Sequence, residues 1–325
     1  MEVKMMSIDE KYMRRCLQLA ACGRQLSRPN PMVGAVIVAP SEENGEDCSR
    51  IIGEGYHVRC GEGHAEVNAF ASVCAADEHL LPQSTIYVSL EPCAHFGKTP
   101  PCADLIVSKK VGRVVVGCLD IFSKVQGRGI QKIRDAGIFV TVGVLEAECQ
   151  WLNRRFFTFH KYHRPYIILK WAQSKNGFID DHQNSVALST PFTQMLVHKL
   201  RASEDAILVG RKTDEREHPQ LTVRHWCGPS PQRFVLGHGR TIDSVLSECY
   251  ERNLQSLIVE GGACTHLSFI QAGLWDELRV EISSKEISDG TRAVDIPPQA
   301  KLTKSLQFGN NIIKTYLNAG TRQDI

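Results

Sequence analysis

Apolar residues recur along the chain at helical and strand spacings, which together predict alternating helices and strands. Ser7 and Glu10 have the spacing of a capping box, and the apolar positions between Met13 and Ala21 recur at helical spacing. This pattern predicts a first amphipathic helix that ends near Gly23. The other helices expected in the first half are 64–76, 102–109, 130–136 and 146–160, and the expected strands are 33–39, 51–56, 85–90, 111–117 and 139–144.

The pattern breaks at residues 161–165, Lys-Tyr-His-Arg-Pro, where Pro165 cannot continue a helix. We place a domain boundary there, between residues 1–160 and 161–325. The second half shows the same alternation without repeating the sequence, so both domains are expected to be of the α/β class, with later strands that are mostly parallel. Its expected helices are 191–202, 243–252 and 263–272, and its expected strands are 166–171, 206–210, 233–236, 256–259, 277–282 and a closing strand, 312–317.

The composition narrows the class of partner. The chain has 325 residues, 42% of them hydrophobic, and a net charge of +2 without any long run of Lys or Arg, so nucleic acid is not an expected partner. No apolar stretch has the length of a membrane span and the first residues lack a signal-peptide core, so we expect a cytoplasmic protein. The 12 cysteines are scattered, which favours reduced and mostly buried thiols over a disulfide framework.

Three short motifs supply the ligands of a catalytic zinc site. They are His64-Ala65-Glu66, Glu91-Pro92-Cys93 and Pro101-Cys102, and they offer one imidazole and two thiols. Zinc held by one His and two Cys keeps an open fourth position, where a bound water has a pKa of about 7. Glu66 projects from its helix in a different direction from His64, so it is free to transfer protons. This inventory predicts hydrolytic deamination.

Other interpretations of the same residues exist. A lone His is more often a core residue, scattered cysteines are more often small apolar side chains, and a structural zinc needs a fourth protein ligand, for which Cys60 and His95 are candidates. The joint pattern of His-Ala-Glu with two cysteines nonetheless favours catalysis.

Zinc deaminases usually separate their two cysteines by two residues, whereas residues 94–101 separate them here. With Asn30-Pro31 and the segment 53–57 upstream, this motif closely resembles the bifunctional deaminase/reductase family of riboflavin biosynthesis. The resemblance implies a cytidine-deaminase-like α/β/α domain that deaminates 2,5-diamino-6-(5-phosphoribosylamino)pyrimidin-4(3H)-one, with His64, Cys93 and Cys102 as zinc ligands and Glu66 as the proton donor. It also implies that four residues hold the ring or the phosphate, although each could equally have a turn-forming or solvated role: Asn30, His57, His95 and Lys98.

Two turns of the second half are suited to phosphate groups. The expected strand 256–259 leads into Glu260-Gly261-Gly262 and a helix, a turn that can place phosphate at a helix N-terminus or merely connect the two elements. Residues 210–213, Gly-Arg-Lys-Thr, also follow a strand, and they are compatible with the 2′-phosphate of NADPH or with a solvated loop end.

The segments 170–174, 200–202, 206–213, 219–224 and 259–262 resemble the reductase half of the same family, whose fold is similar to dihydrofolate reductase. The resemblance implies hydride transfer from NADPH to C1′ of the opened ribose, which yields a ribityl chain. The residues implied to contact NADPH are Ala172, Thr213, Glu217 and Gly262. The residues implied to surround the phosphoribosyl chain are Ser185, Arg201, Leu221, Arg224 and Glu260, and the two arginines suit a phosphate but could instead form surface ion pairs.

One departure from the family keeps alternatives open. The expected strand 233–236 leads almost directly into the helix 243–252, so a segment of longer relatives is missing. The first alternative is therefore a deaminase whose second domain serves binding or dimerisation, and others are a polynucleotide deaminase and a noncatalytic zinc scaffold. We expect Zn²⁺ and NADPH as cofactors, a small phosphoribosylaminopyrimidine as substrate, no nucleic-acid or membrane partner, and a homo-oligomer, either a dimer or a tetramer.

Overall fold

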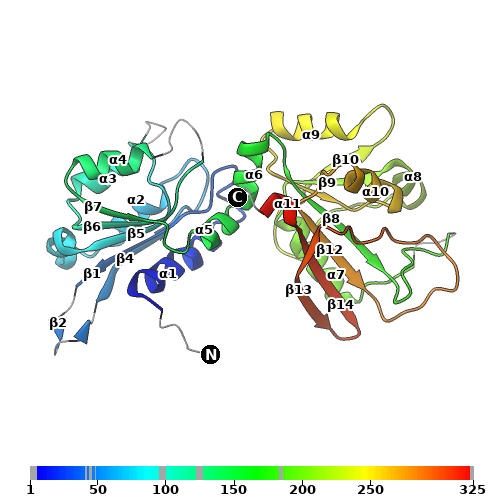
Figure 1. Ribbon diagram of the computed structural model, residues 1–325, viewed down its shortest axis with the longest axis horizontal. Coiled ribbons are helices and arrows are strands. Elements are labelled where there is room, and N and C mark those ends of the chain that lie inside the picture. The colour runs from blue at the N-terminus through cyan, green and yellow to red at the C-terminus, as the bar shows by residue number, and fades with distance from the viewer. Residues whose placement is uncertain are drawn as a thin grey trace. The chain divides into compact units, whose positions relative to one another are not determined.

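Two units make up the chain, residues 1–160 and 161–325. The computed structural model describes residues 6–40, 42–43, 46–47, 49–94, 100–121, 127–182 and 186–322. No helix in these ranges is both long and apolar enough to cross a membrane. Each unit is built around its own β-sheet with helices on both faces (Figure 1).

The first unit contains a five-stranded sheet. Its strands are β1 (Gly34–Ala39), β4 (Arg50–Tyr56), β5 (Thr85–Leu90), β6 (Arg113–Cys118) and β7 (Phe139–Val142), while β2 (Glu42–Glu43) and β3 (Glu46–Asp47) form a separate ribbon. The strand order is β4-β1-β5-β6-β7. β1 pairs antiparallel with β4 and β5, whereas β5, β6 and β7 are parallel, as predicted for the later strands. Strands buried on both faces need continuous apolar sequence, which Val-Ile-Val in β1 and Val-Val-Val in β6 provide.

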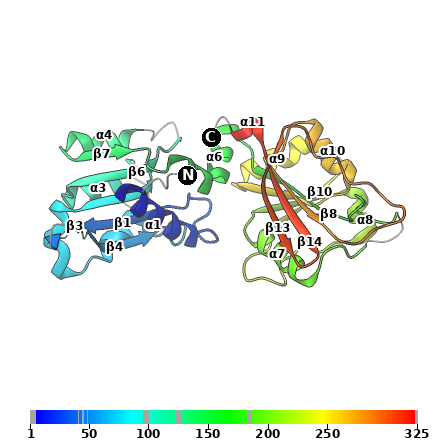
Figure 2. The ribbon, with the colours of Figure 1, turned by 60° about the horizontal axis from the view of Figure 1, so that its bottom comes forward.

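Helices cover both faces of this sheet (Figures 1 and 2), with α2, α3 and α4 on one face and α1 and α5 on the other. The predicted capping box of α1 is confirmed, because Ser7 Oγ accepts the Glu10 N–H at 3.2 Å and the Glu10 carboxylate accepts the Ser7 N–H at 3.1 Å. α1 ends before Gly23, as predicted. The helices are α1 (Ile8–Cys22), α2 (Ala65–Ala71), the 3₁₀ helix η1 (Ala75–Gln83), α3 (Cys102–Ser108), α4 (Arg128–Asp135), α5 (Glu146–Leu152) and α6 (Arg154–Tyr162).

Two helix predictions for this unit were wrong in extent. The segment 146–160 is two helices, α5 and α6, because Asn153 between them uses its side chain elsewhere: it accepts the Met32 N–H at 2.8 Å and donates to the Met32 carbonyl at 2.9 Å. The segment 64–76 is α2 followed by the start of η1. α2 ends at Ser72, whose hydroxyl donates to the Ala69 carbonyl at 2.8 Å and accepts the backbone N–H of Glu54 at 2.8 Å.

The second unit contains a seven-stranded sheet. Its strands are β8 (Tyr166–Gln173), β9 (Ala206–Gly210), β10 (Gln232–Leu236), β11 (Ser256–Val259), β12 (Glu277–Ile282), β13 (Ala300–Phe308) and β14 (Asn311–Asn318). The order is β10-β9-β11-β8-β12-β14-β13. The first five of these strands are parallel, so β10, β9, β11 and β8 end at one shared edge. β14 and β13 continue the sheet in antiparallel pairing.

The helices of the second unit are α7 (Pro191–Ala202), α8 (Arg211–Glu217), α9 (Ile242–Glu251), α10 (Ala263–Gln271) and α11 (Ala319–Arg322). Alternate residues of the parallel strands face opposite sides. Leu169 and Leu208 pack in the core that contains Phe269 of α10, whereas Ile168 and Val209 pack in the core that contains Leu200 of α7. Apolar side chains therefore fill both faces of the sheet, and the polar chemistry is left to the strand ends.

Three elements of the second unit escaped prediction, α8, β13 and the short α11, and one placement was wrong. α8 contains no buried residue and has a wholly polar sequence, so it lacks the apolar period that reveals a helix. β13 is exposed along most of its length and interrupted by a register shift between Leu302 and Lys304. The expected strand 312–317 corresponds to β14, but it does not close the sheet, because β13 lies outside it.

The 11 described cysteines are all free, as expected, but the expectation that most are buried is wrong. Five are exposed, including Cys60, and five are buried, including Cys102.

Candidate active sites

Three ligand side chains converge at one edge of the first sheet. His64 is the N-cap of α2, Cys93 follows β5, and Cys102 is the first residue of α3. Their ligand atoms all lie within 4.8 Å of one another. His64 Nδ1 is 3.3 Å from Cys102 Sγ and 3.6 Å from Cys93 Sγ. The structure thus brings together the three residues that the motifs named as metal ligands.

These separations fit zinc. Zn–S bonds of about 2.3 Å and Zn–N bonds of about 2.0 Å in tetrahedral geometry place the ligand atoms about 3.6 Å apart. Among the described residues, the group has three members, which leaves the fourth position of a tetrahedral ion open. Cys60, one candidate for a fourth ligand, is exposed and outside the group, and His95, the other, lies outside the described residues.

The two thiols differ in their ionisation. Hydrogen bonding from the Cys102 side chain lowers the pKa of Cys93 to about 4, with help from His64 and from the Cys102 backbone N–H, which is 3.3 Å from Cys93 Sγ. The same hydrogen bond, together with burial, raises the pKa of Cys102 well above its ordinary value. Two adjacent sulfurs, of which Cys102 is buried and Cys93 partly buried, cannot both carry charge without a cation, which is the electrostatic condition for a thiolate metal site.

Glu66 is buried beside the ligands, in the first turn of α2. Burial raises its pKa to about 7, although its own backbone N–H opposes the shift. A carboxyl group with a pKa near neutrality can both accept and donate a proton at the pH of the cell. The geometry and the ionisation of Glu66 both suit a proton carrier.

Two of the four predicted ring or phosphate contacts lie next to the ligand group. His57 donates from Nδ1 to the Gly63 carbonyl at 3.1 Å, so its Nε2 accepts from the Asn30 amide at 3.1 Å. The His57 ring meets the His64 ring edge-on, with 5.4 Å between the centroids. Asn30 is therefore held at the ligand group through His57. The other two, His95 and Lys98, lie outside the described residues.

Glu91 organises the loops around the ligands, a role that its motif did not suggest. Its carboxylate accepts the backbone N–H groups of Gly127 at 3.0 Å and Gly129 at 3.2 Å. A Cβ on Gly129 would lie 1.9 Å from the Pro92 carbonyl oxygen, so glycine is required where α4 meets the segment before Cys93. Hydrogen bonds from Gly127 and Gly129 to Glu91 therefore join the segment 91–93 to the segment 127–129.

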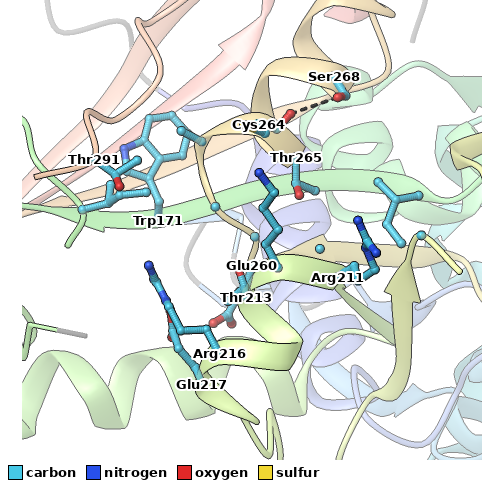
Figure 3. Close-up of a pocket in the computed structure, with 18 of the residues that line it drawn as sticks. Trp171, Arg211, Thr213, Arg216, Glu217, Glu260, Cys264, Thr265, Ser268 and Thr291 are labelled. Carbon is cyan, nitrogen blue, oxygen red and sulfur yellow. Dashed lines mark hydrogen bonds and ion pairs between the residues drawn. The ribbon is translucent and has the colours of Figure 1, made fainter. Parts of the chain in front are cut away.

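The second unit has a cavity of about 840 Å³ at the shared edge where β8, β9, β10 and β11 end (Figure 3). Ligands bind at such an edge in open α/β sheets. The four predicted cofactor contacts, Ala172, Thr213, Glu217 and Gly262, all line it.

Glycines let the turns of this cavity approach one another closely. A Cβ on Gly210 would lie 2.3 Å from Thr265 Oγ1, and a Cβ on Gly261 would lie 2.7 Å from Thr265 Cβ. The turns after β9 and β11 therefore meet at the start of α10. The first backbone N–H groups of a helix have no partner within the helix, so a helix start such as that of α10 can bind phosphate.

A buried ion cluster lies at the β8 end of the cavity. Glu260 accepts two hydrogen bonds from Arg201, at 3.0 and 2.8 Å, and lies 3.9 Å from Lys170 Nζ. Burial alone would raise the pKa of Glu260, but the Lys170 and Arg201 cations together hold it below its usual value. Lys170 and Glu260 both line the cavity, and Lys170 is a residue to which the sequence motif assigned no role.

The other predicted substrate contacts lie around this cluster rather than in the cavity lining. Arg201 also donates to the Thr222 carbonyl at 3.3 Å, so its guanidinium is engaged with Glu260 and the 221–224 segment. Arg224 is exposed, and its backbone N–H donates to His198 Nδ1 at 3.0 Å. Leu221 is buried with a φ of 54°. Ser185 lies outside the described residues.

Two known families match the chain. The cytidine and deoxycytidylate deaminase zinc-binding region matches residues 6–118, and the RibD C-terminal domain matches residues 165–243 and 238–314. The folds and sites thus define a deaminase of the cytidine-deaminase type joined to a reductase, which confirms the predicted fold class.

The chain is 34% identical to the riboflavin biosynthesis protein RibD of Aquifex aeolicus, over 89% of this chain and 90% of that protein. It is 40% identical to RibD of Escherichia coli, over 92% and 94% of the two chains. The chain belongs to the RibD family of riboflavin-biosynthesis proteins.

Among solved structures, the deaminase/reductase of Thermotoga maritima has a TM-score of 0.84 and 31% identity, covering 95% of this chain and 98% of that one. The prediction of a bifunctional enzyme of riboflavin biosynthesis, with deaminase and reductase activities, is confirmed over the deaminase-only alternative.

Proposed function

We propose that residues 1–160 deaminate 2,5-diamino-6-(5-phosphoribosylamino)pyrimidin-4(3H)-one and that residues 161–325 then use NADPH to reduce the ribosyl chain of the product. The observation that carries the proposal is the buried Glu66 beside His64, Cys93 and Cys102, in the same chain as a glycine-lined cavity with an ion cluster. The Thermotoga maritima relative is named as a diaminohydroxyphosphoribosylaminopyrimidine deaminase and 5-amino-6-(5-phosphoribosylamino)uracil reductase, which supports these substrates.

In the first step, His64, Cys93 and Cys102 would hold zinc, and the chemistry that the ion would supply is Lewis-acid activation of water. Glu66 accepts the two protons of the attacking water in turn, and it delivers one to the ring nitrogen and the other to the departing amine. A carbon–oxygen bond forms, the bond to the exocyclic amino group breaks, and ammonia leaves. Asn30, held by His57, is placed to bind the ring as this happens.

In the second step, the 840 Å³ cavity would hold the nicotinamide cofactor, whose chemistry when bound would be hydride donation to C1′ of the opened ribose. Lys170 and Glu260 lie where the cavity meets Arg201, so they form the polar boundary between cofactor and substrate. The turns after β9 and β11 bind the cofactor phosphates through Thr213 and the backbone at Gly262. Arg224, which is exposed beside the same cluster, is available to the substrate phosphate.

A stepwise assay tests both halves. Zinc-replete protein is supplied with the diaminopyrimidinone phosphate, and ammonia release and NADPH oxidation are followed separately. We expect ammonia first, without NADPH, and NADPH oxidation only after deamination. Purified deaminated intermediate serves as the matched control, because it must support NADPH oxidation without releasing ammonia. Absence of both signals from zinc-replete protein would refute the proposal.

A further inference from the structure

The cavity in the second unit extends across the strand ends, and its two ends have different linings. Its lining runs from Trp171 and Ala172 at β8, across β11 and β9, to Leu236 and Gly237 at β10. Three strand spacings separate β8 from β10, about 14 Å, which is a distance that a dinucleotide can span but a single nucleotide cannot. Figure 3 shows Arg211 on the opposite side of the cavity from Trp171 and Thr291. Because the ion cluster of Glu260 lies at the β8 end, the reacting ring belongs there and the adenosine belongs near β10.

The adenosine end is formed by an unusually tight connection between β10 and α9. Gly237 and Arg240 exchange both backbone hydrogen bonds, each at 3.1 Å. The two residues between them, His238 and Gly239, have φ values of 54° and 84°, which is the geometry of a two-residue type I′ turn. The match to the RibD C-terminal domain divides at this connection, between 165–243 and 238–314. The short turn therefore fixes the backbone of Arg240 at the edge of the cavity.

A second arginine lies against the same turn. A Cβ on Gly237 would lie 3.0 Å from Arg211 Cβ and 3.4 Å from Arg211 Cδ, so the glycine makes room for the stem of Arg211. Both arginines line the cavity, although they come from different strand ends. Arg211 is the first residue of α8, and Arg240 ends the two-residue turn after β10, so the two residues flank one part of the cavity.

Among the described residues, neither cation has a buried, unshared ion pair, although the Arg240 guanidinium lies over the Phe234 ring, 5.7 Å from its centroid. In the part of the chain that the structure describes, no carboxylate lies within ion-pair distance of Arg211, and the carboxylates that follow it pair elsewhere, Asp214 with Arg233 and Glu215 with His238. Arg240 pairs with Glu248 at 3.3 Å, but both side chains are partly exposed and Glu248 also binds Arg252 at 2.9 Å. An exposed, shared ion pair of this kind is weak and easily exchanged for another anion.

We propose that Arg211 and Arg240 select the 2′-phosphorylated form of the nicotinamide dinucleotide, and that the short turn after β10 positions Arg240 for this contact. The inference rests on the proposed function, since it requires a nicotinamide cofactor in the cavity. A phosphate at the adenosine 2′ position accepts bidentate hydrogen bonds from guanidinium groups, whereas a free 2′ hydroxyl leaves both cations unsatisfied.

The test compares Arg240→Gln with Arg252→Gln, which removes the other partner of Glu248 but lies outside the cavity lining. The assay uses the full chain and the deaminated intermediate. For Arg240→Gln, KM for NADPH should rise about 10- to 100-fold while KM for NADH and both kcat values stay unchanged. Arg240→Lys should recover part of the loss, and Arg252→Gln should leave all parameters as in the wild type. A similar change in KM for both dinucleotides, or for neither, would overturn the proposal.

Binding of adenosine 2′,5′-bisphosphate and of adenosine 5′-monophosphate, measured by calorimetry, provides a readout that does not need turnover. The wild type should prefer the bisphosphate, and Arg240→Gln should lose that preference. If the wild type oxidises NADPH and NADH equally well, the proposed selection is wrong but the reductase function stands. If it oxidises neither and binds neither nucleotide, the proposed cofactor itself is wrong.

Discussion

Each unit buries one glutamate at its site, and the two glutamates have opposite surroundings. Glu66 is buried with no Lys or Arg among the described side chains that act on it, and burial raises its pKa to about 7. Glu260 is buried between Arg201 and Lys170, and its pKa is held below the usual value. The same side chain is a proton carrier in one environment and a permanent anion in the other. Whether Lys and Arg side chains accompany a buried carboxylate therefore distinguishes the proton carrier from the permanent anion in this chain.

Glu66→Gln is the largest test of this contrast. The substitution preserves shape but removes the proton carrier, so deamination should fall by about 10²- to 10⁴-fold. Oxidation of NADPH with the deaminated intermediate should be unchanged, because the second site does not use Glu66. Ammonia release and NADPH consumption measured on the same preparation, with its zinc content determined, check the result. Near-normal ammonia release would show that Glu66 is not the proton carrier.

Glu260→Gln should have its main effect on stability. Removing the anion leaves Arg201 and Lys170 buried without their counter-charge, and breaking such a cluster costs about 3–5 kcal/mol. Urea unfolding should show that the second unit unfolds at a lower urea concentration than in the wild type, while ammonia release by the first unit is retained. The double variant Glu260→Gln with Arg201→Gln should lose less than the sum of the two single variants, because it removes both members of the pair. Additive losses would mean that the pair is not coupled.

The two sites also differ in how well the sequence predicts them. His64, Glu66 and Cys102 were identifiable because each is a reactive side chain within a short motif, and because helix starts follow from local pattern. Once the chain folds, the helix starts and the end of β5 bring these side chains to the same edge of the sheet. The same logic singled out the segments that contain Thr213 and Gly262, which line one cavity, and their contact with NADPH stays a prediction.

Other contributions to the sites were not predictable, because they are made by contacts rather than by motifs. Asn153 supports the segment after Asn30 from 121 residues away, and no local pattern reports that distance. Glu91 looked like part of a metal motif but binds backbone N–H groups of a distant loop. Arg240 reaches the cavity lining because a two-residue turn follows β10 directly. The missing segment after β10, which made the reductase doubtful from sequence, is replaced by that turn.

The pH dependence of stability should separate the units. Burial lowers the pKa of His266, in the second unit, to about 4, and its Nε2 donates to the Val259 carbonyl at 3.1 Å. Its folded-state pKa lies below the unfolded value of about 6.5, so the unfolded chain binds the proton more readily and stability is lost as pH falls from 6.5 toward 4. The full loss is about 3 kcal/mol. Urea unfolding at several pH values should show this loss in the second unit, and His266→Gln should flatten it. A wild-type slope that survives in His266→Gln would assign the effect to other groups.

The smallest expected effects come from two matched capping boxes, one in each unit. Ser7 caps α1 and Thr190 caps α7, and each side-chain oxygen accepts the N–H three residues on at 3.2 Å. Replacing an N-cap Ser or Thr by Ala costs about 1 kcal/mol, because one N–H loses its partner. Ser7→Ala should therefore lower the unfolding midpoint of the first unit alone, and Thr190→Ala that of the second alone. The unit that unfolds first can be recognised by which activity disappears with it. If either substitution shifts both transitions equally, the two units unfold as one cooperative structure, and the contrast between their glutamates must be sought in rates rather than in separate stabilities.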